Sequence, residues 1–273
     1  MKNIITLIAI SLSMQLFAQE KEQDTMRFNV AGLEFIIINH GEDTLLVSGE
    51  GTSKEVEVGK SKKNKADDDL TYWSGFDFGP SILLNASGGN QINSPYLQMD
   101  PAQSFSYNLN FFEKRIRFGT DHVGLVTGMG LSFSRYGLKN NYQLKQSADS
   151  TWGTLDTLTS FNKNQLRATY LNVPLLLQFN SSKNEDKNFH VAAGVIGGVR
   201  IGSKLVQKFD VLGKESKNKS KGVYNLNSFQ ALATVRMGYN DFGLFANYNL
   251  LPLFEKGKAE QVFPLTMGVS FHF

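Results

Sequence analysis

The stretch Tyr170-Leu171-Asn172-Val173-Pro174-Leu175-Leu176-Leu177-Gln178-Phe179 decides the fold class of this chain. Successive side chains of a strand point to opposite faces, and one face here is wholly apolar: Leu171, Val173, Leu175, Leu177 and Phe179. The opposite face is mixed: Tyr170, Asn172, Pro174, Leu176 and Gln178. About ten residues is the length that a tilted strand needs to cross a bilayer. Taken alone, however, such a strand is more often part of a soluble core.

Seven further segments repeat the alternation, and the repetition changes the interpretation. Each sets bulky apolar residues on one face against Gly, Ser, Asn and Thr on the other. The eight segments cover residues 72–85, 103–112, 123–136, 170–179, 189–201, 229–239, 242–250 and 262–273. They predict an all-β fold, an eight-stranded antiparallel up-and-down transmembrane β-barrel that occupies residues 71–273.

The connections between these segments alternate in length, which is a second signal. Long connections follow the first, third, fifth and seventh segments, at residues 86–102, 137–164, 202–228 and 251–261. Shorter ones follow the others, and Asn240-Asp241 is a tight hairpin turn. Transmembrane barrels have short periplasmic turns and long outer loops. We therefore expect an outer-membrane protein with both termini in the periplasm.

The composition of the two faces separates a membrane barrel from a soluble one. A soluble ligand-binding barrel would carry a charged exterior, whereas here the apolar face is aromatic and branched and draws on 21 phenylalanines. A mean hydropathy of only −0.24 does not contradict this, because only alternate residues face lipid. Pro80, Pro174 and Pro264 conflict with the pattern, since each removes a donor from the hydrogen-bond ladder.

The residues before the barrel form two further parts. Residues 1–19 have a basic start at Lys2 and an apolar run that ends before Ala18, which predicts a secretory signal peptide. Residues 20–70 form an N-terminal β-rich periplasmic segment, with strands across Met26–Asn39 around a turn at residues 31–32, and another near residues 44–48. The charged run at residues 60–69 is typical of a solvated linker.

The sequence YLNVPLLLQF resembles the signature strand of the PorT-like outer-membrane β-barrel family of Bacteroidetes-type bacteria, in which a Tyr-Leu-x-Val/Ile-Pro-Leu-Leu-Leu run is typical. The stretch YWSGFDFG at residues 72–79 is similar to the first segment of that family, and the resemblance spans roughly residues 70–273. It implies a Gram-negative outer-membrane location. It also implies an accessory role in protein secretion, with secretion-system components as partners.

Composition and motifs argue against several classes of function. The chain has no cysteine, which excludes disulfides and cysteine-based metal sites, and a net charge of +3 gives no support for nucleic-acid binding. Only His122 has an acidic neighbour, Asp121, and adjacent strand residues point apart. No nucleophile elbow, metal-ligand spacing or phosphate loop is present. We therefore expect no enzymatic activity and no cofactor, with an outer-membrane hydrolase as a weaker alternative.

Five polar or charged residues share the face that is predicted to point into the lumen: Asp77, His190, Arg200, Arg236 and His272. An unpaired buried carboxylate is costly, so Asp77 is expected to pair with an arginine. These residues predict a polar network that plugs the lumen, and the alternative is a small passive diffusion pore. On the first interpretation the protein is a scaffold or binding protein that works through its extracellular loops.

Two further features predict partners. The third long connection is rich in lysine, which fits a solvated loop or an attraction to outer-membrane lipid and lipopolysaccharide: Lys204, Lys208, Lys214, Lys217, Lys219 and Lys221. The chain ends with Phe271 and Phe273 on the lipid-facing side of the last strand. An aromatic C-terminal strand of this kind predicts an insertion signal for the barrel assembly machinery. The simpler alternative is that both phenylalanines only contact lipid.

Overall fold

The computed structural model describes the backbone of four N-terminal strands and residues 70–273, except residues 121, 184–186 and 212–213. The chain divides into two compact units, Met1–Asp68 and Asp69–Phe273. The first contains an antiparallel meander of β1 (Thr25–Val30), β2 (Leu33–Asn39), β3 (Asp43–Gly49) and β4 (Thr52–Glu57). Strands β1, β2 and β3 cover the stretches for which the sequence predicts strands, the predicted turn at residues 31–32 lies outside the described residues, and β4 is a strand that the sequence does not predict. The predicted signal peptide and charged linker lie outside the described residues.

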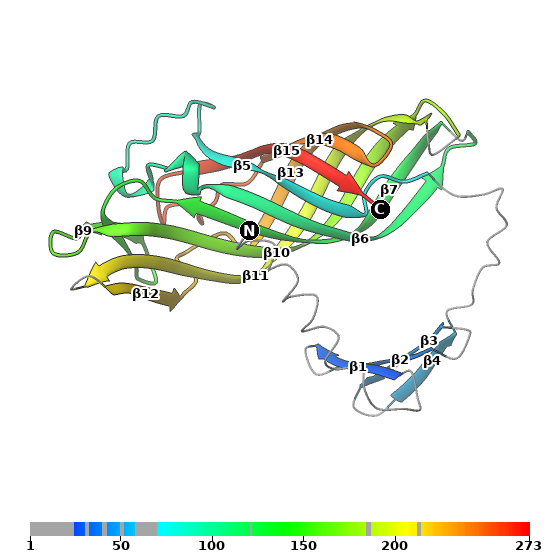
Figure 1. Ribbon diagram of the computed structural model, residues 1–273, viewed down its shortest axis with the longest axis horizontal. Coiled ribbons are helices and arrows are strands. Elements are labelled where there is room, and N and C mark those ends of the chain that lie inside the picture. The colour runs from blue at the N-terminus through cyan, green and yellow to red at the C-terminus, as the bar shows by residue number, and fades with distance from the viewer. Residues whose placement is uncertain are drawn as a thin grey trace. The chain divides into compact units, whose positions relative to one another are not determined.

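The second unit is a closed ring of eight antiparallel strands, as the sequence predicted (Figure 1). In chain order these are β5 (Gly75–Asn85), β6 (Phe105–Arg117), β7 (Val123–Gly137), β10 (Phe161–Asn180), β11 (Phe189–Val211), β13 (Phe229–Tyr239), β14 (Phe242–Asn249) and β15 (Val262–His272). The ring closes where β15 pairs with β5. Each strand therefore pairs with its neighbours on both sides, which leaves no open edge in the ring.

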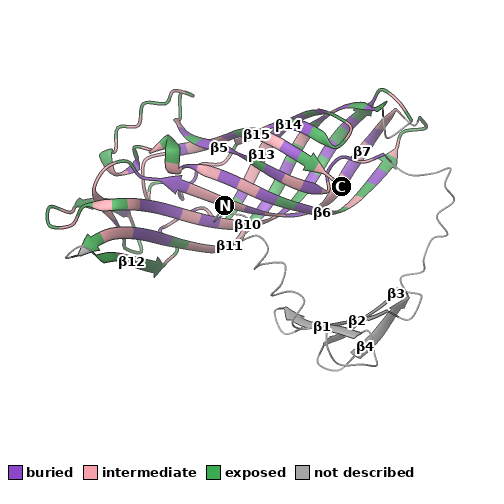
Figure 2. Cartoon of the chain, in the orientation of Figure 1, coloured by how far each residue is buried: buried purple, intermediate pink, exposed green. Residues whose placement is uncertain are grey.

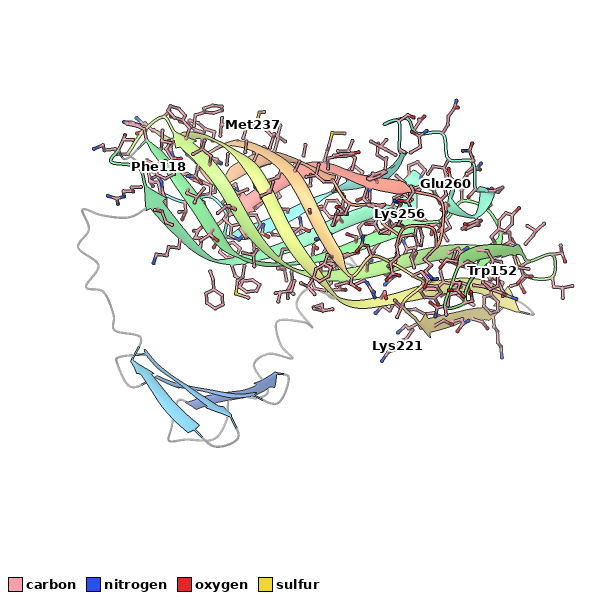
Figure 3. All side chains as sticks on the ribbon, turned by 180° about the vertical axis from the view of Figure 1, so that it is seen from behind. Phe118, Trp152, Lys221, Met237, Lys256 and Glu260 are labelled. Atoms are coloured by element: carbon pink, nitrogen blue, oxygen red, sulfur yellow. The ribbon has the colours of Figure 1, made fainter. Side chains whose placement is uncertain are left out.

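Burial alternates residue by residue along the strands (Figure 2). In the deciding stretch Val173, Leu175 and Leu177 are exposed on the outside, while Asn172 and Gln178 are buried inside. Figure 3 shows Met237 of β13 pointing away from the barrel wall in the same way. The predicted orientation is confirmed, since the apolar face is the outer one. Among the described residues, no helix is long and apolar enough to cross a membrane.

The two ends of the barrel differ. The short-turn end carries the β6–β7 turn near Phe118 and the C-terminus, and the long-loop end carries Trp152 and Lys221 (Figures 1 and 3). At the long-loop end β10 and β11 continue beyond the ring, and β12 (Lys214–Lys221) pairs with the outer part of β11. A hairpin of β8 (Tyr142–Gln146) and β9 (Thr151–Leu155) lies in the same region. The sequence predicts loops for these residues, and that prediction was wrong, because strands beyond the apolar outer belt have no need to alternate apolar with polar residues.

An apolar core closes over the lumen at the long-loop end. Each long connection contributes a buried residue to it: Leu97, which lies in the 3-10 helix η1 (Pro95–Leu97), Leu144, Leu226 and Phe254. A second 3-10 helix, η2 (Pro101–Gln103), leads into β6. These residues pack on Tyr136 and Tyr170, whose side chains face inward from β7 and β10. We call this cluster the cap.

Pro174 is accommodated by a local gap in one ladder. Its strand, β10, pairs continuously with β11 through Pro174 and Ile196. On the other side the pairing of β10 with β7 passes from Asn172 to Leu175 and omits Pro174. The missing N–H of proline therefore falls where β7 does not require it.

Candidate functional site

The interior of the barrel is the candidate site, and the chain itself fills its short-turn half. Residues Leu70 to Ser74 lie ahead of β5, and Leu70, Tyr72 and Trp73 are buried. We call these five residues the lead-in segment. The carbonyl of Leu70 accepts hydrogen bonds from Gln178 Nε2 at 2.9 Å and Asn180 Nδ2 at 3.0 Å. The inward polar residues of β10 therefore hold the lead-in segment in the lumen.

Trp73 is the largest side chain in this half of the lumen. Its indole Nε1 donates to the carbonyl of Met129 at 2.9 Å, inside the gap in the ladder between β7 and β10. The glycine side of β7 makes room for it, because a Cβ atom at Gly128 would lie 2.7 Å from the indole ring. Glu113 accepts hydrogen bonds from the backbone N–H groups of Trp73 and Ser74, both at 2.8 Å. Trp73 is thus fixed at both its ring and its backbone.

Asp77 and Arg236 form a buried ion pair beside Trp73. Arg236 Nη2 lies 2.5 Å from Asp77 Oδ1, and the two side chains are 4% and 2% exposed. Asn110 donates to the other carboxylate oxygen at 2.9 Å, and Asn108 does so at 3.2 Å. The guanidinium carbon of Arg236 also lies 5.2 Å from the centroid of the Trp73 ring. The carboxylate of Asp77 is therefore paired and hydrogen-bonded, as a buried charge requires, whereas Nε and Nη1 of Arg236 have no hydrogen-bond partner among the described residues.

His190 and His272 lie together at the short-turn end of the lumen. The ring of Tyr72 stacks on His190 with centroids 3.7 Å apart, and the two histidine rings meet edge to face at 5.3 Å. Among the described residues, no group of three or more His, Cys, Asp or Glu side chains could hold a metal ion. Four of the five predicted lumen residues thus lie in the short-turn half, around the lead-in segment.

Arg200 is the fifth, and the prediction that it shares a network with Asp77 was wrong. Its guanidinium donates to the carbonyls of Asn227 at 3.3 Å and Leu226 at 3.2 Å, which belong to the cap end. His190 and Arg200 share a face of β11, but ten residues of strand place them roughly 33 Å apart along its axis. Alternation identifies the face of a residue and says nothing about its depth.

The middle of the lumen is also filled by side chains. Gln230 Nε2 donates to Asn172 Oδ1 at 2.7 Å across β13, β11 and β10. The described residues around Ser106, Tyr136 and Asn247 enclose a cavity of about 20 Å³. A water molecule needs roughly 10–15 Å³ of such volume. This cavity therefore holds about one water and is not part of a channel.

Sequence reasoning did not identify the lead-in segment. Trp73 has the same parity as Asp77, so alternation gives it an inward side chain, but we had assigned residues 72–74 to the first strand. The partners Glu113 and Gln178 are inward polar residues that give no signal by themselves. The two predicted insertion residues lie as expected on the outside: Phe271 packs edge to face on Phe242, with centroids 5.6 Å apart, and Phe273 is 87% exposed. Their role in insertion stays a prediction.

The sequence from residue 56 to residue 255 matches the family described as outer membrane protein beta-barrel domain. The chain belongs to this family. Its exposed apolar belt is accordingly the lipid-facing surface of an outer-membrane barrel. No curated protein matches the chain.

Two solved structures are similar to this outer-membrane barrel. The first is the attachment invasion locus protein Ail of Yersinia pestis, with 13% identity and a TM-score of 0.29 over 73% of this chain and 99% of that one. The second is Ail in complex with the heparin analogue sucrose octasulfate, with 14% identity and a TM-score of 0.29 over 73% of this chain and 96% of that one.

Proposed function

We propose that this outer-membrane barrel is a non-catalytic scaffold or binding protein that works through its long-loop end and does not conduct solutes. The observation that carries the proposal is that both halves of the lumen are occupied by the chain's own residues. The lead-in segment fills the short-turn half, the cap covers the long-loop half, and a cavity of about 20 Å³ lies between Ser106 and Asn247. A diffusion pore would need a continuous polar path in place of these contacts.

The same filling disfavours a hydrolase. Among the described residues of the barrel, His190 and His272 are the inward histidines, and they pack on each other and on Tyr72 at the short-turn end, where His190 is buried and His272 is partly buried. His122, at the short-turn end, uses its Nδ1 to contact the carbonyl of Asn180 at 2.8 Å. The packing around His190 and His272 leaves no room for a substrate beside their rings. The hydrogen bond of His122 stabilises the turn in which it lies.

The long-loop end offers a surface on which a partner could bind. Trp152 and Leu155 on β9 are exposed there, and Leu158, which follows them, is 98% exposed. Apolar side chains of this size gathered on a hairpin are typical of protein contacts. The proposal places this hairpin outside the cell and both termini in the periplasm. It also assigns the protein an accessory role in secretion, as the PorT-like resemblance implies.

Planar-bilayer recording of the purified, folded protein tests whether the lumen is closed. The proposal expects no ohmic steps across the membrane. Capture of partners from native outer membranes tests the binding role, with Trp152→Ala/Leu158→Ala compared with Met237→Ala on the lipid-facing wall. Loss of captured proteins with the hairpin variant alone supports the proposal, whereas steady conductance of the unmodified protein overturns it.

A further inference from the structure

Cations from four neighbouring strands stand in one row at the long-loop end. Strand register places Arg135 of β7 directly opposite Arg167 of β10, Arg167 opposite Lys204 of β11, and Lys204 opposite Lys221 of β12. Neighbouring strands lie about 4.8 Å apart, so the row spans roughly 14 Å. All four side chains share the outer face, which is the face that carries the lipid-exposed residues farther along the strands.

A second row of cations lies two rows beyond the first. Register pairs Lys163 of β10 with Lys208 of β11, and Lys208 with Lys217 of β12. Lys219 stands in the row between, opposite Val206. The eight cations form what we call the basic face: Arg135, Lys163, Arg167, Lys204, Lys208, Lys217, Lys219 and Lys221. At its far end Glu215 pairs with Lys208 at 2.7 Å, which leaves the first row with an excess of positive charge.

The arrangement is unfavourable for the sheet alone. Like charges directly opposite each other on neighbouring strands destabilise their pairing. Burial lowers the pKa of Lys163, and the charges of its neighbours, Arg167 first among them, lower it further. Lysines on an edge strand such as β12 commonly prevent unwanted strand pairing. That explanation fails for Arg135, Arg167 and Lys204, because their strands are paired on both sides.

The position of the first row points to the membrane surface. Two rows closer to the middle of the barrel, register aligns the apolar residues Leu131, Leu171 and Val199. Four residues of strand separate Leu131 from Arg135, which is about 13 Å. Tyr107 lies between these levels and accepts a hydrogen bond from Arg135 at 3.1 Å. Cations just above an apolar belt with an aromatic border lie at the depth of lipid headgroups.

A groove of about 290 Å³ opens on this row. Its walls include Arg167, Lys204 and Lys221, with Thr169 and Ser203 as further polar groups. Ile201 also lines it and is 59% exposed, at the point where β11 bulges against β10. The groove thus joins three cations to an apolar surface that continues into the lipid-facing belt. A ligand that carries both an anionic group and hydrocarbon chains matches this combination.

We propose that the basic face binds the phosphate groups of an outer-leaflet glycolipid, with the first row and its groove as the primary site. Arg167, Lys204 and Lys221 contact one phosphate, and the acyl chains lie along the apolar wall below Ile201. This inference deepens the proposed function, since it names a ligand for the long-loop end and rests on the placement of that end outside the cell.

Binding of diphosphoryl lipid A to the folded protein in detergent, followed by native mass spectrometry, tests this site. The variant Arg167→Gln/Lys204→Gln/Lys221→Gln should weaken binding at least tenfold. The control variant Lys139→Gln/Lys145→Gln/Lys256→Gln removes the same charge from exposed positions at the same end, and it should bind within about twofold of the unmodified protein. Heat-modifiable migration on gels establishes that each variant is folded, and Lys204→Gln alone provides a milder change should the triple variant fail to fold.

Three outcomes would overturn the inference. They are equal binding by the triple variant, equal binding of dephosphorylated lipid A, and tighter binding of a soluble sulfated polysaccharide that displaces the lipid. The conductance measurement is independent of all three. If the barrel conducts ions but binds the phosphorylated lipid at this row, the proposed closed lumen is wrong and the lipid site is supported. If the barrel does not conduct and does not bind the lipid, the lipid site is wrong and the closed lumen is supported.

Discussion

Removal of the Asp77 carboxylate should destabilise the barrel more than any change to a surface ion pair. In Asp77→Ala the guanidinium of Arg236, whose side chain is 4% exposed, loses its counter-charge and stays buried. Breaking a buried ion pair by removing one partner costs about 3–5 kcal/mol, because the remaining charge is uncompensated. Asn108 and Asn110 also lose the carboxylate to which they donate. We expect a decrease in the free energy of unfolding within that range.

The chain offers a matched comparison. Lys258 and Asp149 form an ion pair at 3.2 Å in the exposed loops of the long-loop end. Exposed pairs contribute about 0–1 kcal/mol, so Asp149→Ala should change stability little. The double variant Asp77→Ala/Arg236→Leu removes both buried charges and should recover most of the loss caused by Asp77→Ala, since an apolar replacement of a buried pair is often neutral.

Urea unfolding in lipid vesicles, followed by tryptophan fluorescence and by heat-modifiable migration, measures all of these differences. A loss below about 1 kcal/mol for Asp77→Ala would contradict the description of Asp77 and Arg236 as an ion pair buried in the lumen. So would a double variant that is no more stable than Asp77→Ala, because the penalty would then not come from an unpaired charge.

Three further changes have defined outcomes. Trp73→Ala should cost about 3–5 kcal/mol in the same assay, because it leaves a cavity in the lead-in segment, and a loss below 1 kcal/mol would contradict the packing described. Phe273→Ala should lower the outer-membrane level and leave refolding in detergent near normal, whereas Phe118→Ala, at the same end, should insert normally; normal levels of Phe273→Ala would refute the insertion signal. Burial alone would raise the pKa of Glu260, but hydrogen bonds from Ser94 and from the backbone of residue 93 hold it below its ordinary value of 4.5. The ionised Glu260 therefore stabilises the loop at residues 86–104 fully above pH 4.5, and this stabilisation is lost as the pH falls through the lowered pKa of the folded state. Limited proteolysis of residues 86–104 should increase over that range, and Glu260→Gln should remove the pH dependence; an unchanged profile in that variant would contradict this role.

The eight strands could be predicted from the sequence because lipid and lumen impose opposite polarity on alternate residues. The alternation of Val173, Leu175 and Leu177 with Asn172 and Gln178 is a direct consequence of those two environments. Even Pro174, which conflicts with an ideal ladder, fits once the gap opposite β7 is seen. Because lipid and lumen impose their polarity on every second residue, the pattern can be recognised within each short stretch of sequence.

The strands of the long-loop end could not be predicted in this way. β8, β9 and β12 lie beyond the apolar belt, where no lipid requires one face to be hydrophobic. Strand β12 reads KESKNKSK and has the composition of a loop. It forms a strand because β11 continues past the ring and offers it a partner, which is a tertiary effect.

The lumen was predictable in part. The cost of a buried carboxylate indicated that Asp77 pairs with an arginine, and Arg236 lies in that position. Arg200 was assigned to the same network because alternation gives the face and not the depth. The sequence does not identify Trp73 as part of a segment inserted into the lumen. The residues around it alternate in the same way whether they continue the first strand or turn into the barrel.

The closed lumen is tested by the ion conductance of the folded, full-length protein in planar bilayers. Both the lead-in segment and the cap fill the interior, so the unmodified barrel should remain silent at all applied voltages. Trp73→Ala, if it remains folded, should show at most brief, irregular openings, because the cap still covers the other half. Steady ohmic steps from the unmodified protein would contradict the closed lumen and favour a diffusion pore.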